Sequence, residues 1–336
     1  MGDRRHAACI LDAEGEITAE ELIPNTHECL EALSQRYPGA VIAMETGTHS
    51  PWISRLFEAR KHRVIVANAR KLHAISQSHT KSDVEDARLL ARLCRADPKL
   101  LSPVKHRSEA CQRALLSLKV RDTLVRSRVD QTNSLRFLVK SLGLRVPAGI
   151  KASAFTRKVR GALDAATCAL VEPLLVAIDA LSAQIKTLDA RLEQLAAETY
   201  PDTAKVQQIP GVGPLTALCF ILTLESHERF PQAREVGAYL GLVPRRDQSG
   251  TSDKPLGITK AGNTQLRCLL VNCAHYILGP FGPPSDLREA GLRIAASGGK
   301  AAKKRAVIAV ARKLAVTMMV LWRSNAVYQP TLLRAA

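Results

Sequence analysis

The stretch AVIAMETGT, residues 40–48, decides how the N-terminal part of the chain folds. Residues 40–44 form a short apolar run, which predicts a buried strand, and Glu45 ends it. A second run of this kind, HRVIVA, follows at residues 62–67, with an expected helix over residues 51–60 between them. Strands that alternate with helices indicate an α/β domain with parallel strands, whose functional groups collect at the carboxyl ends of the strands.

The chain before this stretch predicts a β-hairpin and a helix. Residues 6–12 and 17–23 read as two strands joined by the turn at residues 13–15. Asn25 and Thr26 form a cap-like pair ahead of a helix that ends at Tyr37.

A capping box starts the next helix at KSDVEDARLLARL, residues 81–93. Ser82 is the expected N-cap and Glu85 the residue at N3, so Asp83 and Asp86 lie on one face of the first turn. Two such carboxylates suit a divalent cation, although acids also favour a helix N-terminus through the helix dipole alone. With Glu45 at the end of a strand, the three acids have the layout of a ribonuclease-H-like magnesium site; for Glu45, a solvated loop position is the alternative.

The middle of the chain predicts long helices. Seven apolar residues recur at alternating spacings of four and three, which is a heptad seam: Leu174, Ile178, Leu181, Ile185, Leu188, Leu192 and Leu195. The partner of this seam is either the preceding helix, expected within residues 109–142, or a second copy of the chain.

Composition favours a polyanionic partner. Of 336 residues, 48 are Lys or Arg and 31 are Asp or Glu, for a net charge of +17 and a pI near 9.8. The net charge rises from +2 over residues 1–107, through +5 over residues 108–200, to +10 over residues 201–336. With only 4% aromatic residues, contacts to a phosphate backbone are favoured over stacking on bases.

Other classes are excluded by composition and spacing. The run from Pro214 to Leu224 is too short to cross a membrane, and residues 306–322 are interrupted by Arg312 and Lys313. The eight cysteines have no zinc-site spacing, so we expect reduced thiols in a soluble, cytoplasmic protein without membrane contact.

The last third carries two candidate nucleic-acid elements. IPGVG, residues 209–213, places Gly211 and Gly213 in a turn that suits phosphate contact, as in helix-hairpin-helix proteins, or is an ordinary tight turn. Ser249 follows a basic pair, Arg245 and Arg246, in a segment rich in Gly and Ser that could equally be a linker. We expect further phosphate contacts from Lys254, Lys260 and Arg267.

Four motifs together resemble a known family: METG at residues 44–47, KSDVEDARLLARL at 81–93, IPGVG at 209–213 and GLVPRRDQSGTSDKPLGITKAGNTQLR at 241–267. The chain resembles the DEDD transposases of insertion-sequence family 110 (IS 110), relatives of the Piv recombinase. The resemblance covers nearly the whole chain. It implies a fold of class α/β plus α: a RuvC-like domain at residues 1–107, a coiled coil at 108–200 and a helical transposase domain at 201–336.

The resemblance also implies an activity and its residues. Glu45, Asp83 and Asp86 match the second, third and fourth acids of a Mg²⁺ site, and Ser249 matches the nucleophile of a DNA recombinase. A hydroxyl is a weak nucleophile until it is activated, so the serine would need the metal-binding domain. The partners implied are DNA, a structured guide RNA in some members, and further copies of the chain, in a dimer or tetramer.

One part of the family pattern is not matched. The family's first acid is an Asp at the end of a first strand, followed by Gly-Asp-Arg, and here Gly2, Asp3 and Arg4 match what comes after that Asp. We therefore expect that the first strand and its Asp lie upstream of the assigned start. Two alternatives remain open: a catalytically inactive nucleic-acid-binding remnant, and a Holliday-junction nuclease that uses the acids alone.

Overall fold

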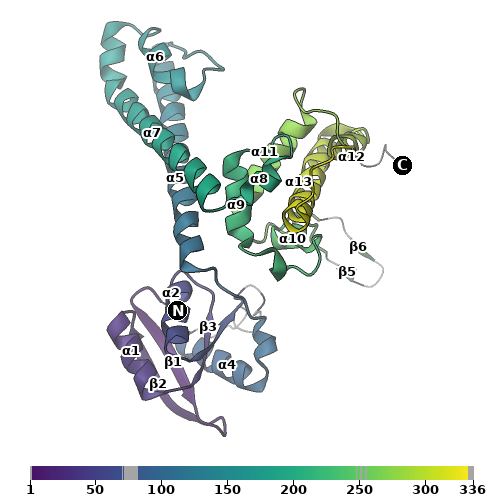
Figure 1. The fold of residues 1–336 in the computed structure, drawn as a ribbon. Coiled ribbons are helices and arrows are strands. Elements are labelled where there is room, and N and C mark those ends of the chain that lie inside the picture. Colours follow the sequence, from purple (N-terminus) through teal and green to yellow (C-terminus); the bar gives the residue numbers. More distant parts are fainter. Residues whose placement is uncertain are drawn as a thin grey trace. The chain divides into compact units, whose positions relative to one another are not determined.

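The computed structural model describes residues 2–69, 71, 82–246, 248–249, 252–253 and 256–331. The chain divides into two compact units, Met1–Ser108 and Glu109–Ala336, and each is described by itself. The first combines strands and helices, and the second is almost entirely helical (Figure 1). The fold is therefore of the expected class, α/β followed by α.

The N-terminal unit begins with the predicted hairpin. Strands β1 (Arg5–Leu11) and β2 (Ile17–Pro24) pair antiparallel, from Arg5 opposite Pro24 to Ile10 opposite Ala19. Asp12 closes the turn because its Oδ1 accepts hydrogen bonds from the backbone N–H of Gly15 and Glu16, at 2.7 and 2.8 Å.

The second pair of strands is parallel, as predicted. β3 (Val41–Glu45) lies beside β4 (Arg63–Ala67), with Glu45 opposite Ala67 at the carboxyl ends. Among its described residues the unit also has three helices and a 3₁₀ turn: α1 (His27–Arg36), α2 (Ser50–Ala59), α4 (Asp83–Ala96) and η1 (Pro98–Leu101). Thr26 caps α1 as predicted, accepting from the N–H of Cys29 at 3.3 Å.

The two faces of β3 pack against different helices. Met44 belongs to a core with Leu30 of α1 and Ile53 of α2, and Ala8 of β1 packs against the same core. Ala43 faces the other way, against a cluster that includes Leu90 of α4. Because side chains alternate along a strand, Glu45 points to the same face as Ala43, the face covered by α4.

The seam predicted in the middle of the chain packs against the preceding helix. α5 (Glu109–Leu138) and α7 (Ala165–Glu198) form a helical hairpin, with Ile178, Ile185 and Leu192 of the seam buried. The Arg121 guanidinium of α5 donates to the Asp189 carboxylate of α7 at 2.6 Å. This is the intramolecular alternative for the seam, and pairing with a second copy stays a prediction.

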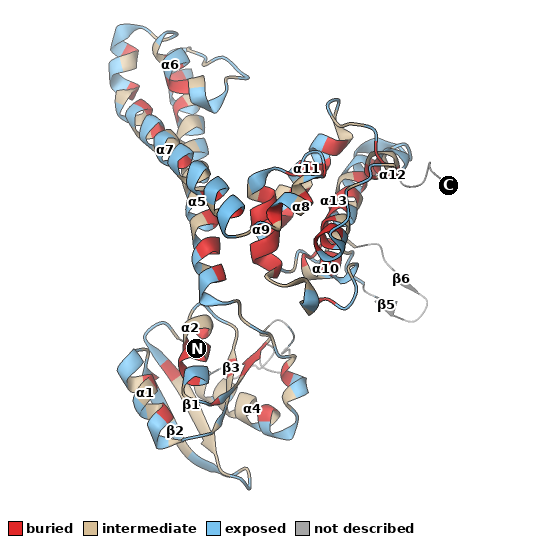
Figure 2. Ribbon diagram, in the orientation of Figure 1, coloured by how far each residue is buried: buried red, intermediate tan, exposed pale blue. Residues whose placement is uncertain are grey.

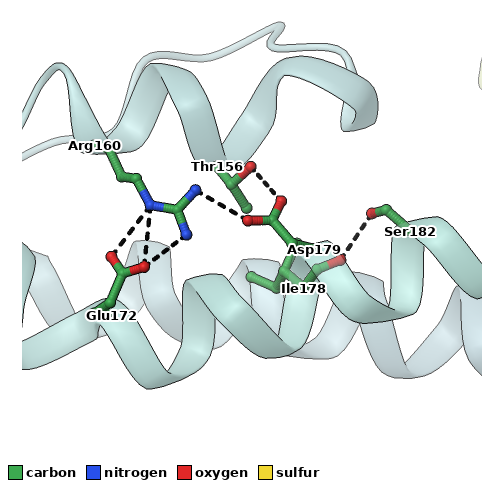
Figure 3. A network of polar contacts seen from close by, with 6 residues as sticks. All are labelled: Thr156, Arg160, Glu172, Ile178, Asp179 and Ser182. Carbon is green, nitrogen blue, oxygen red and sulfur yellow. Dashed lines mark hydrogen bonds and ion pairs between the residues drawn. The ribbon is translucent and has the colours of Figure 1, made fainter.

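A polar network joins α7 to the short helix α6 (Phe155–Arg160), as Figure 3 shows. The Arg160 guanidinium reaches Glu172 at 2.7 Å and Asp179 at 3.0 Å, and the Thr156 hydroxyl donates to Asp179 at 2.6 Å. Hydrogen bonding from Arg160 lowers the pKa of Glu172. Within the described residues, α7 is the one helix long and apolar enough to cross a membrane, and these paired charges favour its role as a hairpin helix in water.

Connecting 3₁₀ turns lie at η2 (Val139–Leu142), η3 (Ala152–Ala154) and η4 (His227–Arg229). The remaining helices of this unit pack around one core: α8 (Thr203–Gln207), α9 (Pro214–Leu224), α10 (Glu235–Tyr239), α11 (Thr264–Leu278), α12 (Asp286–Ala295) and α13 (Gly299–Ser324). The apolar helix α9 is the most deeply buried, as the red colour in Figure 2 shows. Trp322 of α13 is also buried, and its indole N–H donates to Asp202 at 2.9 Å.

The turn between α8 and α9 requires a glycine at Gly211. Its φ is +93°, and a Cβ there would lie 2.6 Å from the Tyr276 ring of α11. We expect Gly211→Ala to lower the free energy of unfolding by about 1–3 kcal/mol, because it combines backbone strain with a clash. Gly213→Ser is the matched control, since Gly213 has a φ of −84° and open space around it. Thermal unfolding measures both, and equal melting temperatures would contradict the prediction.

Candidate functional site

The three predicted acids lie along one groove of the N-terminal unit. Glu45 ends β3, and Asp83 and Asp86 are in the first turn of α4. The predicted capping box is present, because the N–H of Glu85 donates to the Ser82 hydroxyl at 3.2 Å. All three acids line a groove of about 700 Å³ between β1 and β3.

The groove is mostly apolar away from these acids. Residues 6–13, which include most of β1 and the start of the turn after it, form one side, and residues 40–45, which include β3, form the other. Leu90 and Cys94 of α4 belong to its lining as well. The acids therefore lie in a groove that has a strand along each of its two long sides.

The three carboxylates are suitable metal ligands by their chemistry, but their positions do not form a metal site. Carboxylate oxygens are the ligands that Mg²⁺ and other hard cations prefer. Among the described residues, however, no three His, Cys, Asp or Glu side chains gather closely enough to hold one ion. The structure therefore places the three acids along one groove without gathering them around a single ion.

Ser249 lies in a small hairpin of the C-terminal unit. β5 (Gln248–Ser249) pairs with β6 (Ser252–Asp253), with Ser249 opposite Ser252. The pairing continues at the base of the hairpin, where the N–H of Arg245 donates to the carbonyl of Gly257 at 3.0 Å. The side chains of Arg245 and Arg246 are exposed on this base.

Arg267, which we predicted to contact a phosphate, is buried and hydrogen-bonded within the C-terminal unit. The residue is only 8% exposed, and its guanidinium donates to the carbonyls of Leu240 at 3.0 Å and Ala261 at 2.7 Å. It also contacts the Thr264 hydroxyl at 3.2 Å. Leu240 precedes the serine hairpin and Ala261 follows it, so Arg267 holds the two ends of that segment together instead of presenting its charge to a phosphate.

We expect Arg267→Met to destabilise the C-terminal unit by about 1–3 kcal/mol, because two backbone carbonyls lose their donor. Denaturant unfolding measures this loss, and Arg246→Met, at an exposed position, is the control. A variant with unchanged stability but weaker, less salt-dependent DNA binding would instead support the phosphate contact.

The structure describes some of the other residues that we predicted to contact DNA, and not all of them. Lys260 is exposed and has a φ of +54°, at the base of the serine hairpin. Gly213 is the N-cap of α9, whereas the close contact with Tyr276 accounts for Gly211. Lys254 lies outside the described residues.

Sequence reasoning missed His6, which lines the groove from β1. His6 is 7% exposed, and burial lowers its pKa. Nothing in the local sequence marks His6, because its burial follows from strand pairing.

Comparison with known proteins identifies the class. Residues 1–143 match the family model of the DEDD transposases, and residues 203–285 match that of the IS116/IS110/IS902 transposases. The chain is 30% identical over 255 residues to the transposase for insertion sequence element IS1111A of Coxiella burnetii, covering 74% of this chain and 68% of that protein.

Two other relatives extend the similarity. The transposase for IS1328 of Yersinia enterocolitica is 27% identical over 244 residues, which cover 72% of each chain. The pilin gene-inverting protein of Moraxella bovis is 26% identical over 294 residues, covering 85% of this chain and 80% of that protein.

The two family matches and these relatives together define the chain as a DNA transposase. The chain belongs to the IS116/IS110/IS902 family of transposases.

Proposed function

We propose that this transposase cuts and rejoins the DNA of an insertion sequence with Ser249 as its nucleophile and with a Mg²⁺-dependent, RuvC-like N-terminal unit. The observation that carries the proposal is that Glu45, at the carboxyl end of β3, and Asp83 and Asp86 of α4 line the same groove. The carboxyl end of a strand is where an α/β sheet places its functional groups. Bound there, Mg²⁺ would stabilise the charge that develops on phosphate oxygens.

In the proposed serine chemistry, each phosphorus–oxygen bond that breaks is replaced by a new one. The Ser249 Oγ attacks phosphorus and loses its proton, while the DNA oxygen departs and takes up a proton. The product is a phosphoserine link, and attack on it by a DNA hydroxyl restores both the phosphodiester and the serine. The exposed Arg245 and Arg246 supply positive charge beside this serine, which offsets the charge of the phosphate.

We propose DNA as the principal partner and the cytoplasm as the place of action. The +10 net charge of residues 201–336 supports binding to phosphates, and an RNA would satisfy the same charge. A structured guide RNA is therefore included as a second partner to be tested. Because strand exchange joins cut ends from two DNA sites, we further propose an assembly of at least two copies.

A denaturing gel tests the proposal. The protein is incubated with labelled element-end DNA and Mg²⁺, with and without RNA transcribed from the flanks of the element. A covalent protein–DNA adduct that forms only with Mg²⁺ is the expected result. Salt-sensitive DNA binding without cleavage under every condition would instead indicate a binding protein.

A further inference from the structure

The positive charge of residues 201–336 is concentrated in their last third. Residues 201–289 contain nine Lys or Arg and eight Asp or Glu, so their charges nearly cancel. Residues 290–336 contain nine Lys or Arg and no Asp or Glu. Almost all of the +10 net charge therefore belongs to the segment that starts within α12 and includes α13, and not to the segment that carries Ser249.

The cations of α12 and α13 are exposed and lack acidic partners. The two helices lie side by side (Figure 1). Arg121 of α5 and Arg160 of α6, by contrast, are paired with carboxylates. Like charges without counter-charges repel one another, so such a surface favours an anionic partner. Seven exposed cations of α12 and α13 form no ion pair within the described residues: Arg293, Lys300, Lys303, Lys304, Arg305, Arg312 and Lys313.

Three of these cations line a groove to which both helices contribute. The groove has a volume of about 1020 Å³, and its lining includes Arg293 of α12 and Arg312 and Lys313 of α13. The groove combines this positive charge with apolar surface. The apolar part of the lining comes from both helices: Leu287, Ala290, Ile294, Ala309, Val310 and Val316.

The segment that follows α13 forms a wall of this groove, because residues 328–330 also belong to the lining. The carbonyl of Pro330 accepts from the N–H of Asp286 at 2.8 Å, and the N–H of Tyr328 donates to the Gln208 side-chain oxygen at 2.8 Å. Asp286, the first residue of α12, is the one acid among the lining residues, and Tyr328 is the one aromatic residue. Because hydrogen bonds to two other segments hold this wall, the groove exists before a partner binds.

The combination of charge and apolar surface selects the kind of partner. A nucleic-acid duplex presents its phosphates outward, but its base faces are stacked inside and are not offered to an apolar surface. An unpaired strand presents phosphates and base faces together, and grooves with cations and apolar or aromatic walls bind such strands. Aromatic residues make up only 4% of this chain, so here aliphatic side chains supply most of the apolar contact.

We propose that the groove lined by α12, α13 and residues 328–330 binds an unpaired strand of nucleic acid, with Arg293, Arg312 and Lys313 on its phosphates. A DNA strand displaced from its duplex and a single-stranded segment of RNA share this chemistry, and the experiment below distinguishes them. The inference rests on the proposed function in taking nucleic acid as the partner, but it requires neither Ser249 nor a metal.

Oligonucleotide binding to the full chain tests the inference. Fluorescence anisotropy measures the affinity for unstructured oligo(dT), for oligo(U) and for a DNA duplex of the same length, over a range of salt concentrations. The groove variant combines Arg293→Gln, Arg312→Gln and Lys313→Gln. For the single strands, the slope of log affinity against log salt concentration should become shallower by about 2, because each phosphate contact contributes about 0.7. The affinity for the duplex should change no more than in the charge control.

The charge control removes three exposed cations elsewhere in the C-terminal unit, with Lys140→Gln, Lys186→Gln and Arg191→Gln, and should leave the slope for single strands unchanged. A second pair of variants, Ala309→Glu and Ala309→Gln, places side chains of equal size in the groove lining. The glutamate variant should bind single strands about 10-fold more weakly than the glutamine variant, because its carboxylate repels phosphates. Thermal unfolding establishes that each variant is folded.

The outcomes separate the possible partners. Groove-dependent binding that is tighter for oligo(dT) identifies a DNA strand, and tighter binding of oligo(U) identifies RNA; either result supports the inference. Equal losses in the groove variant and the charge control, or for single strands and the duplex, would overturn it. Unchanged strand binding with an altered oligomeric state would also overturn it and assign the groove to a contact between copies of the chain.

The test also separates this inference from the proposed function. Strand binding that depends on the groove, in a protein that forms no covalent adduct with DNA, would count against the proposed function alone. Adduct formation together with strand binding that is unaffected in the groove variant would overturn the groove inference and leave the proposed function standing.

Discussion

Ser249→Ala is expected to abolish the covalent protein–DNA adduct, with strand cleavage falling by about 10³-fold or more. The substitution removes the only atom that forms the proposed link to phosphorus. Alanine is compatible with a strand of two residues, so DNA binding and the melting temperature should stay at the level of the unsubstituted protein. Adduct on a denaturing gel and DNA affinity by gel shift measure the two quantities separately.

Ser252→Ala is the control for this experiment, because Ser252 lies directly opposite Ser249 in the same hairpin. It changes an equivalent hydroxyl without touching the proposed nucleophile, and it should leave the adduct in place. Cleavage that persists in Ser249→Ala would contradict the serine mechanism and favour a nuclease that uses the acids alone.

Asp86→Asn or Glu45→Gln should reduce Mg²⁺-dependent cleavage by at least about 100-fold, since even residues that only support metal ligands contribute up to that much. Both changes keep the shape of the side chain and remove the charge that a cation requires. The reaction is measured over a titration of Mg²⁺. Substitutions that raise the Mg²⁺ requirement identify ligands, while DNA binding without metal reports on folding.

Glu85→Gln is the matched control within the same helical turn. The Glu85 carboxylate is ion-paired with Arg88 and is absent from the groove lining, and glutamine preserves the capping box. Loss of cleavage in Glu85→Gln as large as in Asp86→Asn would show that helix integrity, not metal binding, explains both results.

Much of the fold could be predicted because its signals are local. Thr26 and Ser82 are N-cap residues that mark the starts of their helices. The apolar runs around Glu45 predict the parallel strands. The position of Glu45 followed from the rule that functional groups lie at the carboxyl ends of parallel strands, whereas Asp83 and Asp86 were placed by the capping box of α4.

What could not be predicted depends on contacts between distant residues. Arg267 looks like a surface cation by sequence, and only the closure of the hairpin brings the carbonyls of Leu240 and Ala261 within its reach. Likewise, the heptad seam does not reveal its partner, because a neighbouring helix and a second copy offer the same apolar surface. The burial of His6 depends on how the strands of the N-terminal unit are arranged beside one another.

The anchorage of the serine hairpin by Arg267 has an evolutionary consequence. The guanidinium binds main-chain carbonyls at the two ends of the segment, so it places no demand on the side chains between them. The attachment of the segment therefore does not depend on the identity of its side chains, including those of Ser249, Arg245 and Arg246. The chemistry of the hairpin and the stability of its attachment can therefore change independently of each other in evolution.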